Sequence, residues 1–462
     1  MTFGSKGWTW REVDAEVGRA VAWLSTRGVQ RNMYVVVASA NRPELVFLFF
    51  ACARLGAIFV PLNARLTPSE RGALTQTLEP RIEISSLELP GNSAVADTEH
   101  AEPTQRGALE SNALNEAARD EPAWSQTASP NTSRDEAAID ERSVAAGLFT
   151  SGTTATPRFV PLRHSQFIAS ARASTENLGV RPDDCWLGTL PLFHVGGLAL
   201  VYRWALQATW LQLEPGFDVS VARAALVEGR VTHASLVPTM LQRVLAEPVT
   251  FSPRLRAVLI GGAAMSPELS ALARARSLPV LQTYGLTEAC SQVATERPAE
   301  ADGTTSGPPL PGVEVRIVDG EIHVRGATVS APEWFATGDL GELDTRGRLL
   351  VHSRRVDLII SGGENIAPAE IERLLARHPA IVEVAVVPRD DAEWGQVPVA
   401  VVVWRTDATP VLPWLRDQLA GFKRPRAVLS VPELPRNANG KIERRTLVDG
   451  VRSGAFPVVE TT

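Results

Sequence analysis

Short apolar segments alternate with helical ones near the start of the chain, and this alternation limits the fold more than any other feature. Residues 34–38 and 58–62 are apolar stretches of strand length. Between them, Asn41 and Pro43 mark the start of a helix that runs to about Leu55. Apolar strands joined by a helix are typical of a parallel sheet covered by helices. We therefore expect an α/β fold.

The pattern changes along the chain and divides it into parts. Strand and helix signals resume at Ala145, and residues 303–352 then show short alternating strands with Gly turns, which predict a small antiparallel β unit. A separate α/β segment follows. We expect a large N-terminal domain, residues 1–353, made of parallel-sheet α/β subdomains plus the β unit. It is hinged to a small α+β C-terminal domain, residues 354–462.

Several element ends are visible in the sequence. Thr9 and Glu12 have the capping-box spacing, so a helix begins there and ends near Gly28. The C-terminal part shows two helical and two strand patterns, over 368–377 and 411–419 and over 381–387 and 397–404. Residues 88–142 are rich in Ala and small polar residues, so we expect poor order or loose packing there, with one short helix near 107–119 as the alternative.

Composition excludes several classes of protein. The chain has 462 residues and a net charge of −6, which argues against nucleic-acid binding. Its three cysteines lack C-x-x-C spacing, so neither a zinc site nor a disulfide framework is expected. The N-terminus has no secretory signal, and the longest apolar run, residues 45–53, is too short to insert into a membrane. A cytoplasmic protein is expected, and a homo-oligomer stays open.

A hydroxyl-rich loop carries the strongest chemical signal. It follows the apolar Leu148 and Phe149 and contains Thr150, Ser151, Gly152, Thr153, Thr154 and Arg158. Hydroxyls and free N–H groups in a Gly-containing turn form a nest for anionic oxygens, and an arginine adds a fixed positive charge. The loop suggests a phosphate site, although a solvated Ser/Thr turn is the favoured explanation when the loop is taken alone.

Three more segments suggest a nucleotide. Small residues follow the apolar strand 257–260, where a flat ring can approach the backbone: Gly261, Gly262, Ala263 and Ala264. Next comes a segment in which Tyr284 can stack on a base, Thr287 can bond a phosphate and Glu288 is a hard oxygen ligand for Mg²⁺. Asp339 stands in a sequence that we expect to be a Gly turn, where a carboxylate can accept from ribose hydroxyls.

Two segments near the C-terminus are also distinctive. One is a short stretch in which Arg354 is followed by an apolar strand and then by a Gly-Gly turn. The turn contains Ser361, Gly362, Gly363 and Glu364. In the other, Lys441 follows a flexible Asn-Gly turn and can reach a site on another domain. A surface hairpin and a solvated lysine are the plain alternatives for these two segments.

In this combination and order, the segments resemble the acyl-adenylate-forming superfamily, which includes acyl- and aryl-CoA synthetases. The resemblance covers nearly the whole chain outside 88–142. It implies that a carboxylate attacks the α-phosphate of ATP to give an acyl-adenylate and pyrophosphate, and that CoA then displaces AMP. It further implies that the C-terminal domain rotates between these half-reactions, and that ATP, Mg²⁺ and CoA are required.

The resemblance also assigns roles. The loop from Thr150 to Arg158, with Thr287, would hold phosphates, and Glu288 would hold Mg²⁺. Adenine and ribose would lie against Gly261, Gly262, Ala263, Ala264, Thr283, Tyr284, Asp339 and Arg354. Lys441 would act in adenylation, and Ser361 to Glu364 would line the path of CoA. Phe159 stands where the family has glycine, and this altered loop leaves a non-catalytic nucleotide- or acyl-binding relative open.

The acyl group is indicated by a further segment, Leu190 to Gly197. In relatives its histidine, here His194, lies near the reacting carboxylate, and Gly196 follows it. This segment looks most like the o-succinylbenzoate–CoA ligases of menaquinone biosynthesis, whose substrate has two carboxylates. Arg203, in an apolar stretch, would anchor the second carboxylate. In the alternative, another aryl- or medium-chain acyl-CoA ligase, Arg203 would be structural.

Overall fold

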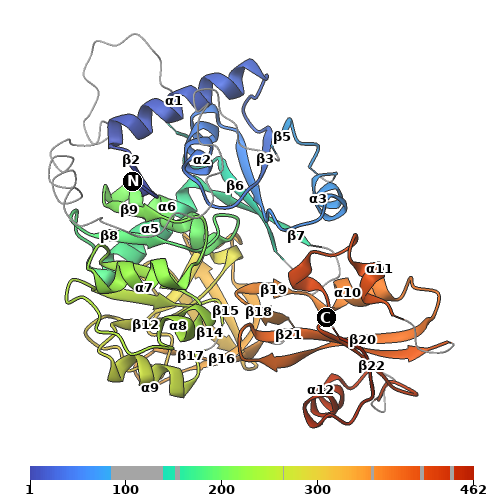
Figure 1. Cartoon of the computed structure of the whole chain (residues 1–462). Coiled ribbons are helices and arrows are strands. Elements are labelled where there is room, and N and C mark those ends of the chain that lie inside the picture. The colour runs from blue at the N-terminus through green and yellow to red at the C-terminus, as the bar shows by residue number, and fades with distance from the viewer. Residues whose placement is uncertain are drawn as a thin grey trace.

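A large N-terminal domain and a small C-terminal domain make up the chain, and the small domain lies against one side of the large one (Figure 1). The structure is a computed structural model, and it describes residues 1–76, 78–84, 139–150, 157–263, 265–354, 358–405, 410–436 and 442–461. The predicted fold class is confirmed. The domain boundary at 353 and 354 stays a prediction. The expectations for 88–142, including the short helix, fall largely outside the described residues.

Five strands of the large domain form a mainly parallel sheet in the order β5-β3-β4-β6-β7. The predicted strands are β3 (Tyr34–Ala38) and β4 (Ile58–Leu62), and they pair in parallel as expected. The other strands are β5 (Ile82–Ile84), β6 (Val144–Thr150) and β7 (Arg158–Arg163). The helices of this part are α1 (Trp10–Thr26), α2 (Pro43–Leu55) and α3 (Pro68–Thr75).

The starts of these helices follow from local hydrogen bonding. Thr9 and Glu12 form the predicted capping box of α1, and Thr67 and Glu70 form a second one at α3. The helix predicted to open at Asn41 and Pro43 and to run to about Leu55 is confirmed as α2, with Arg42 as its N-cap and Pro43 as its first residue. The Asn41 side chain is buried and bonds a distant segment of the chain.

A second, eight-stranded sheet has the order β13-β12-β11-β10-β8-β9-β1-β2. Its strands are β1 (Thr2–Phe3), β2 (Lys6–Gly7), β8 (Cys185–Gly188), β9 (Trp210–Leu213), β10 (His233–Leu236), β11 (Ala257–Ile260), β12 (Val280–Leu286) and β13 (Ser291–Thr295). The helices here are α5 (His164–Leu178), α6 (Val195–Gln207), α7 (Val219–Val227), α8 (Pro238–Val244), α9 (Pro267–Ala275) and the 3₁₀ helix η2 (Thr287–Ala289).

Aromatic packing joins the two sheets. The ring of Phe49 on α2 lies 5.4 Å from that of Phe59 on β4 and 6.1 Å from that of Phe167 on α5. Phe167 in turn stacks on Tyr202 of α6 at 4.7 Å. Phe49, Phe59 and Phe167 are fully buried, and burial of each large side chain stabilises the fold by about 2 kcal/mol. This shared core fixes α6, which positions the acyl segment.

The predicted β unit is confirmed as a four-stranded antiparallel sheet of β14 (Val313–Val318), β15 (Glu321–Gly326), β16 (Phe335–Leu343) and β17 (Leu349–Arg354). The expected Gly turn around Asp339 is wrong, because Asp339 lies within β16. A Cβ on Gly341 would come within 2.4 Å of the Leu350 carbonyl oxygen. The glycine therefore permits a close strand contact rather than a reversal of the chain.

The small domain is built on a six-stranded sheet in the order β19-β18-β21-β22-β23, with β20 also paired to β21. Its strands are β18 (Ile359–Ser361), β19 (Glu364–Ile366), β20 (Ile381–Asp391), β21 (Gly395–Trp404), β22 (Ala427–Ser430) and β23 (Val458–Thr461). Its helices are α10 (Pro368–Leu375), α11 (Leu412–Leu415), α12 (Arg444–Ser453) and the 3₁₀ helix η3 (Gly421–Lys423).

The helix predicted over 411–419 is wrong in length. Only α11 forms, and Gln418 N–H then donates to the Leu415 carbonyl at 3.1 Å, an i to i+3 bond that tightens the chain into turns. These turns lead into η3. The predicted strands and the helix at Pro368 are confirmed, each with ends shifted by a few residues.

Phe159 on β7 is accommodated by the absence of a side chain on the neighbouring strand. A Cβ on Gly147 of β6 would come within 2.0 Å of Phe159 Cζ. The Phe159 ring also packs 5.3 Å from that of Phe149 and 5.7 Å from that of Tyr34. The large side chain at position 159 thus fills the space over Gly147.

Among the described residues, no helix is both long enough and apolar enough to cross a membrane. The three cysteines Cys52, Cys185 and Cys290 are free thiols.

Candidate active site

Tyr284 and Asp339, predicted to hold adenine and ribose, lie side by side. The Tyr284 hydroxyl donates to Asp339 Oδ2 at 2.6 Å, and both side chains are buried. Tyr284 comes from β12 and Asp339 from β16, so the bond joins the eight-stranded sheet to the β unit. Arg354, of which only the backbone is described, lies opposite Asp339 in the register of β16 and β17.

The glycines after β11 lie next to this pair. A Cβ on Gly261 would come within 2.8 Å of Thr283 Cγ2, so only glycine leaves the backbone this close to β12. Gly262 has a φ of 78°, which favours glycine. The Thr283 hydroxyl donates to the Ala294 carbonyl at 3.1 Å and is thus engaged within the sheet. Ala263 continues the same turn, and Ala264 lies outside the described residues.

Thr287 and Glu288 form a compact turn at the end of β12. They lie in η2, and the Ser330 N–H donates to the Glu288 carbonyl at 2.7 Å, which anchors the turn. The Glu288 side chain is half-buried, and among the described residues no basic group pairs with its carboxylate. Mg²⁺ in nucleotide sites is typically held by one or two carboxylates plus phosphate oxygens. The donor set therefore fits Mg²⁺ bound together with a nucleotide.

The two ends of the phosphate loop are described and its middle is not. Thr150 ends β6 and Arg158 begins β7, where they face each other in the antiparallel register. The Thr150 hydroxyl donates to the Arg158 carbonyl at 3.4 Å, and the Arg158 side chain is exposed. Ser151, Gly152, Thr153 and Thr154 lie outside the described residues, as does Lys441.

His194 is held at the start of α6 by a buried side chain that the sequence did not reveal. Asn41 Nδ2 donates to the Leu190 carbonyl at 2.9 Å, and Leu192 N–H donates to Asn41 Oδ1 at 2.8 Å. His194 is the N-cap of α6, with Gly196 in the first turn. A Cβ on Gly197 would come within 2.2 Å of the Pro191 carbonyl oxygen, so glycine lets the segment fold tightly on the helix.

Glu364 brings the small domain into contact with His194. Its Oε2 lies 3.0 Å from His194 Nε2, and its Oε1 accepts from Asn63 Nδ2 at 3.2 Å and from Arg65. Glu364 is 6% exposed. Burial raises its pKa, but the bonds from His194 and Arg65 outweigh burial and hold the pKa below its usual value. The carboxylate therefore stays ionised and receives the His194 Nε2–H.

The Gly-Gly turn that carries Glu364 packs closely on the large domain. Gly362 and Gly363 join β18 to β19 with φ angles of 58° and 88°. A Cβ on Gly363 would lie 3.4 Å from Val237 in the large domain. A Cβ on Gly362 would come within 2.7 Å of the Trp394 ring. Ser361, Gly362, Gly363 and Glu364 thus lie together at the boundary between the domains, near His194.

Arg203 is buried on α6 and is 3% exposed. Its guanidinium donates to Ser174 Oγ at 3.3 Å and lies 4.8 Å from the centre of the Trp186 ring. No carboxylate of the described residues pairs with it. Burial lowers its pKa to about 10. A buried cation without an anionic partner is costly, which makes Arg203 a candidate to bind an anion supplied by a ligand.

The residues that sequence reasoning missed lie between strands and helices of the large domain. Asn63 directly follows the apolar strand β4, and Arg65 comes two residues later. Polar residues after a strand of a parallel sheet are a recognised signal for a site at that edge. Asn63 and Arg65 could have been found in this way, whereas nothing local marks Asn41 as a partner of the segment at Leu190.

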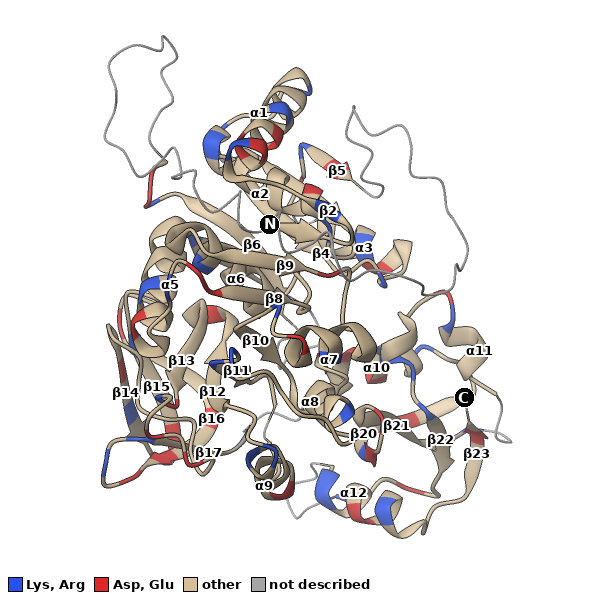
Figure 2. Cartoon of the chain, turned by 60° about the vertical axis from the view of Figure 1, so that its left-hand side comes forward, with Lys and Arg blue, Asp and Glu red and all other residues tan. Residues whose placement is uncertain are grey.

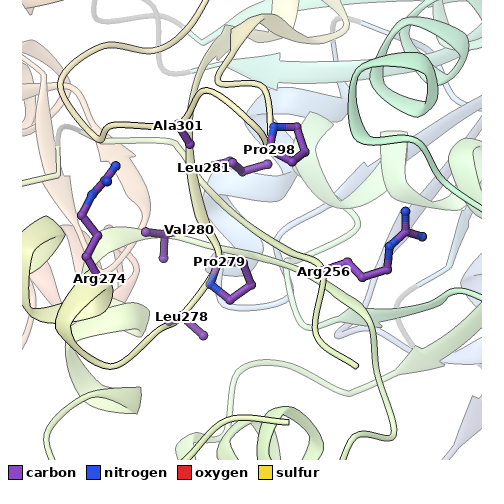
Figure 3. Close-up of a pocket in the computed structure, with 8 residues that line it drawn as sticks. All are labelled: Arg256, Arg274, Leu278, Pro279, Val280, Leu281, Pro298 and Ala301. Carbon is purple, nitrogen blue, oxygen red and sulfur yellow. The ribbon is translucent and has the colours of Figure 1, made fainter. Parts of the chain in front are cut away.

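A surface pocket of about 150 Å³ lies elsewhere, beside residues 278–281 (Figure 3). Arg256 and Arg274 flank it on opposite sides. Arg256 already pairs with Asp184 and donates to the Gly179 carbonyl at 2.8 Å. None of the predicted site residues lines this pocket.

Comparison with known families gives two matches. Residues 1–332 match the AMP-binding enzyme family, and residues 370–441 match the family of AMP-binding enzyme C-terminal domains.

Individual relatives agree with these matches. The 2-succinylbenzoate–CoA ligase of Enterococcus faecalis is 33% identical over 96% of this chain and 93% of its own. A double mutant of the Bacillus subtilis o-succinylbenzoate CoA synthetase, bound with its product analogue OSB-NCoA, has a TM-score of 0.82 at 31% identity, covering 97% of this chain and 95% of its own. The same synthetase with ATP and magnesium ion has a TM-score of 0.64 at 30% identity, covering 96% and 95%.

Proposed function

Because the chain belongs to the AMP-binding enzyme family, we propose that it is an ATP-dependent acid–CoA ligase that converts o-succinylbenzoate to o-succinylbenzoyl-CoA. The observation that carries the proposal is the contact between His194 of the large domain and Glu364 of the small domain, 3.0 Å apart. It brings the segment that resembles an acyl site together with the hairpin that resembles a CoA path. Such a joint site suits a reaction that needs both an activated acyl group and CoA.

In the first half-reaction, a carboxylate oxygen of the acid bonds to the α-phosphorus of ATP, and pyrophosphate leaves. We assign the phosphates to the loop from Thr150 to Arg158 and to Thr287. Adenine and ribose are assigned to the turn at Gly261, to Tyr284 and to Asp339, with Arg354 nearby. Glu288 and the phosphate oxygens would hold Mg²⁺, which would offset the negative charge of the phosphates. Lys441 stabilises the charge that develops between the carboxylate and the α-phosphate.

In the second half-reaction, the CoA sulfur bonds to the carbonyl carbon of the acyl-adenylate and AMP leaves. Glu364 orients the His194 ring beside the acyl group, and the backbone from Ser361 to Gly363 lines the path of CoA. ATP and CoA are cytoplasmic metabolites, so we assign the reaction to the cytoplasm.

Arg203 supports a substrate with two carboxylates. One carboxylate of o-succinylbenzoate reacts, and the other needs an anchor in an apolar setting. A buried guanidinium with no carboxylate partner in the described chain has the charge and the burial for this role. Other aryl or medium-chain acids have only one carboxylate and would leave this cation unpaired.

The test is to incubate the protein with ATP, Mg²⁺, CoA and a mixture of o-succinylbenzoate, benzoate, and short- and medium-chain acids. Thioesters are then identified by mass spectrometry. We expect o-succinylbenzoyl-CoA to dominate. If thioesters form only from the monocarboxylates, the protein is an acid–CoA ligase but o-succinylbenzoate is not its substrate. ATP binding with no thioester and no pyrophosphate from any acid would instead support the non-catalytic alternative.

A further inference from the structure

Within the described part of the chain, one short segment of the large domain, residues 63–70, makes most of the hydrogen bonds to the small domain. Asn63 and Arg65 bond Glu364. The Arg65 guanidinium also lies 4.8 Å from the centre of the Phe422 ring of η3. Glu70, at the start of α3, receives two further donors from the small domain. Figures 1 and 2 both show α3 beside the end of the small domain that carries α10 and α11.

Glu70 performs two tasks with one carboxylate. Its Oε2 accepts from Thr67 N–H at 2.8 Å and from the Thr67 hydroxyl at 2.9 Å, which completes the capping box of α3. The same oxygen accepts Ala420 N–H of the small domain at 3.0 Å. Its Oε1 accepts from Lys423 Nζ, also at 3.0 Å. The cap fixes the side chain in place, so little conformational entropy is lost when the small domain binds it.

Lys423 connects the two domains through a buried cluster of charges. Its Nζ lies 3.0 Å from Glu70 and 2.8 Å from Glu370 of α10. The side chains of Lys423, Glu70 and Glu370 are only 10%, 9% and 12% exposed. Lys423 and Glu370 belong to the same domain and stay paired wherever it moves. The bonds to Glu70 exist only while the small domain is docked as in this structure.

This docked arrangement agrees better with one comparison structure than with another. The TM-score is 0.82 with the synthetase bound to its product analogue and 0.64 with the synthetase bound to ATP and magnesium ion. A contact that exists in one arrangement alone shifts the population toward that arrangement.

We propose that Glu70 is a positioning residue for the CoA-dependent half-reaction: by receiving Lys423 and Ala420 N–H, it holds the small domain so that Glu364 meets His194. The inference rests on the proposed function for the reaction it serves. Glu70 caps a helix and lies outside the predicted site, yet we expect it to affect thioester formation and not adenylate formation.

The main test compares the two half-reactions in Glu70→Gln. Glutamine still caps a helix at this position and still accepts a hydrogen bond, but it removes the charge that pairs with Lys423. Starting from supplied o-succinylbenzoyl-adenylate and CoA, we expect thioester formation to slow about tenfold or more, equivalent to about 1.4 kcal/mol. Pyrophosphate release from ATP and o-succinylbenzoate should stay within about twofold.

Glu12→Gln is the matched control. Glu12 holds the same capping position on α1, with its Oε2 at 2.7 Å from Thr9 N, and touches no residue of the small domain among its described contacts. It should leave both half-reactions unchanged. Lys423→Met should reproduce the selective loss. An equal loss of both half-reactions in Glu70→Gln, or no loss in either, would overturn the proposal.

A measurement without substrates separates this inference from the proposed function. Amide hydrogen exchange should speed up at 420–423 in Glu70→Gln and not in Glu12→Gln, because loss of the charge that pairs with Lys423 weakens docking and Ala420 N–H is then separated from its acceptor more often. If the unmodified protein makes no thioester, the proposed function fails and so does the catalytic part of this role. Unchanged exchange in Glu70→Gln would then also reject the docking itself.

Discussion

At the scale of single residues, Arg203 is the side chain whose position is hardest to explain by folding alone. It is a cation on a buried helix face, between Ser174 and the ring of Trp186. Replacing buried ionic groups by apolar residues of similar volume is often neutral or stabilising. The buried charge is therefore the reason for our proposal that Arg203 binds an anionic ligand.

Arg203→Met should separate ligand binding from stability. We expect KM for o-succinylbenzoate to rise about 30-fold, because one charge-assisted hydrogen bond contributes about 2 kcal/mol. KM for benzoate should change little, and the midpoint of thermal unfolding should stay the same or rise. Steady-state kinetics with both acids and a melting curve decide this. Equal increases in KM for the two acids would make Arg203 structural.

Lys441→Ala should abolish formation of the acyl-adenylate, since the lysine is assigned to charge stabilisation in that step alone. A supplied acyl-adenylate should still react with CoA. Pyrophosphate release and single-turnover thioester formation measure the two steps. Arg445→Ala, an exposed basic residue nearby, is the control and should keep both. Loss of both steps in Lys441→Ala would refute this division of roles.

At the scale of elements, the sequence predicted best where the signal is local. The apolar strands β3 and β4 and the capping box at Thr9 depend on adjacent residues, and all three are confirmed. The expected Gly turn at Asp339 was wrong because glycine also permits close strand contact, as at Gly341. Such contact depends on a partner strand that the local sequence does not show.

The candidate site shows the same limit. Tyr284 and Asp339 were each found by motif, and the structure brings them together. Asn41 was missed as a site residue because its partners at Leu190 and Leu192 are 149 and 151 residues away. The second role of Glu70 was missed because its partner Lys423 lies 353 residues away. No local pattern encodes such pairs.

The contact between α5 and α6 should make stability depend on pH. His164 Nδ1 bonds the Tyr202 hydroxyl, and burial lowers the His164 pKa to about 4. Between pH 4 and 6.5 the unfolded chain binds this proton and the folded chain does not, so stability rises with pH. The stabilisation that comes from His164 is complete above about pH 6.5 and is lost as the pH falls toward 4. The free energy of unfolding falls by at most about 1.4 kcal/mol for each pH unit.

Urea unfolding at pH 7 and pH 5 tests this. His164→Gln should show a shallower loss of stability between the two values than the unmodified protein. His352→Gln is the control, because the His352 side chain is 51% exposed. This variant should keep the pH dependence of the unmodified protein. An unchanged dependence in His164→Gln would exclude His164 as its source.

At the scale of the whole molecule, the two domains complete one site between them. The large domain supplies His194, Asn63 and Arg65, and the small domain supplies Glu364. The Glu364 carboxylate can pair with His194 and Arg65 only while the two domains are docked. Its ion pairs therefore depend on the relative position of the domains.

Glu364→Gln should therefore act on one half-reaction. We expect thioester formation from supplied acyl-adenylate and CoA to slow about tenfold, because an amide does not hold His194 and Arg65 as a carboxylate does. Adenylate formation should stay within about twofold. Glu433→Gln, an exposed carboxylate of the same domain, is the control. A variant that loses adenylate formation as well would show that Glu364 is needed beyond the CoA step.

The packing of Phe159 over Gly147 makes the two positions depend on each other. A Cβ at position 147 would come within 2.0 Å of Phe159 Cζ, so a side chain there would force the ring to move. A small residue at position 159 would instead leave space between β6 and β7. A substitution at one position therefore changes which residues the other position accepts.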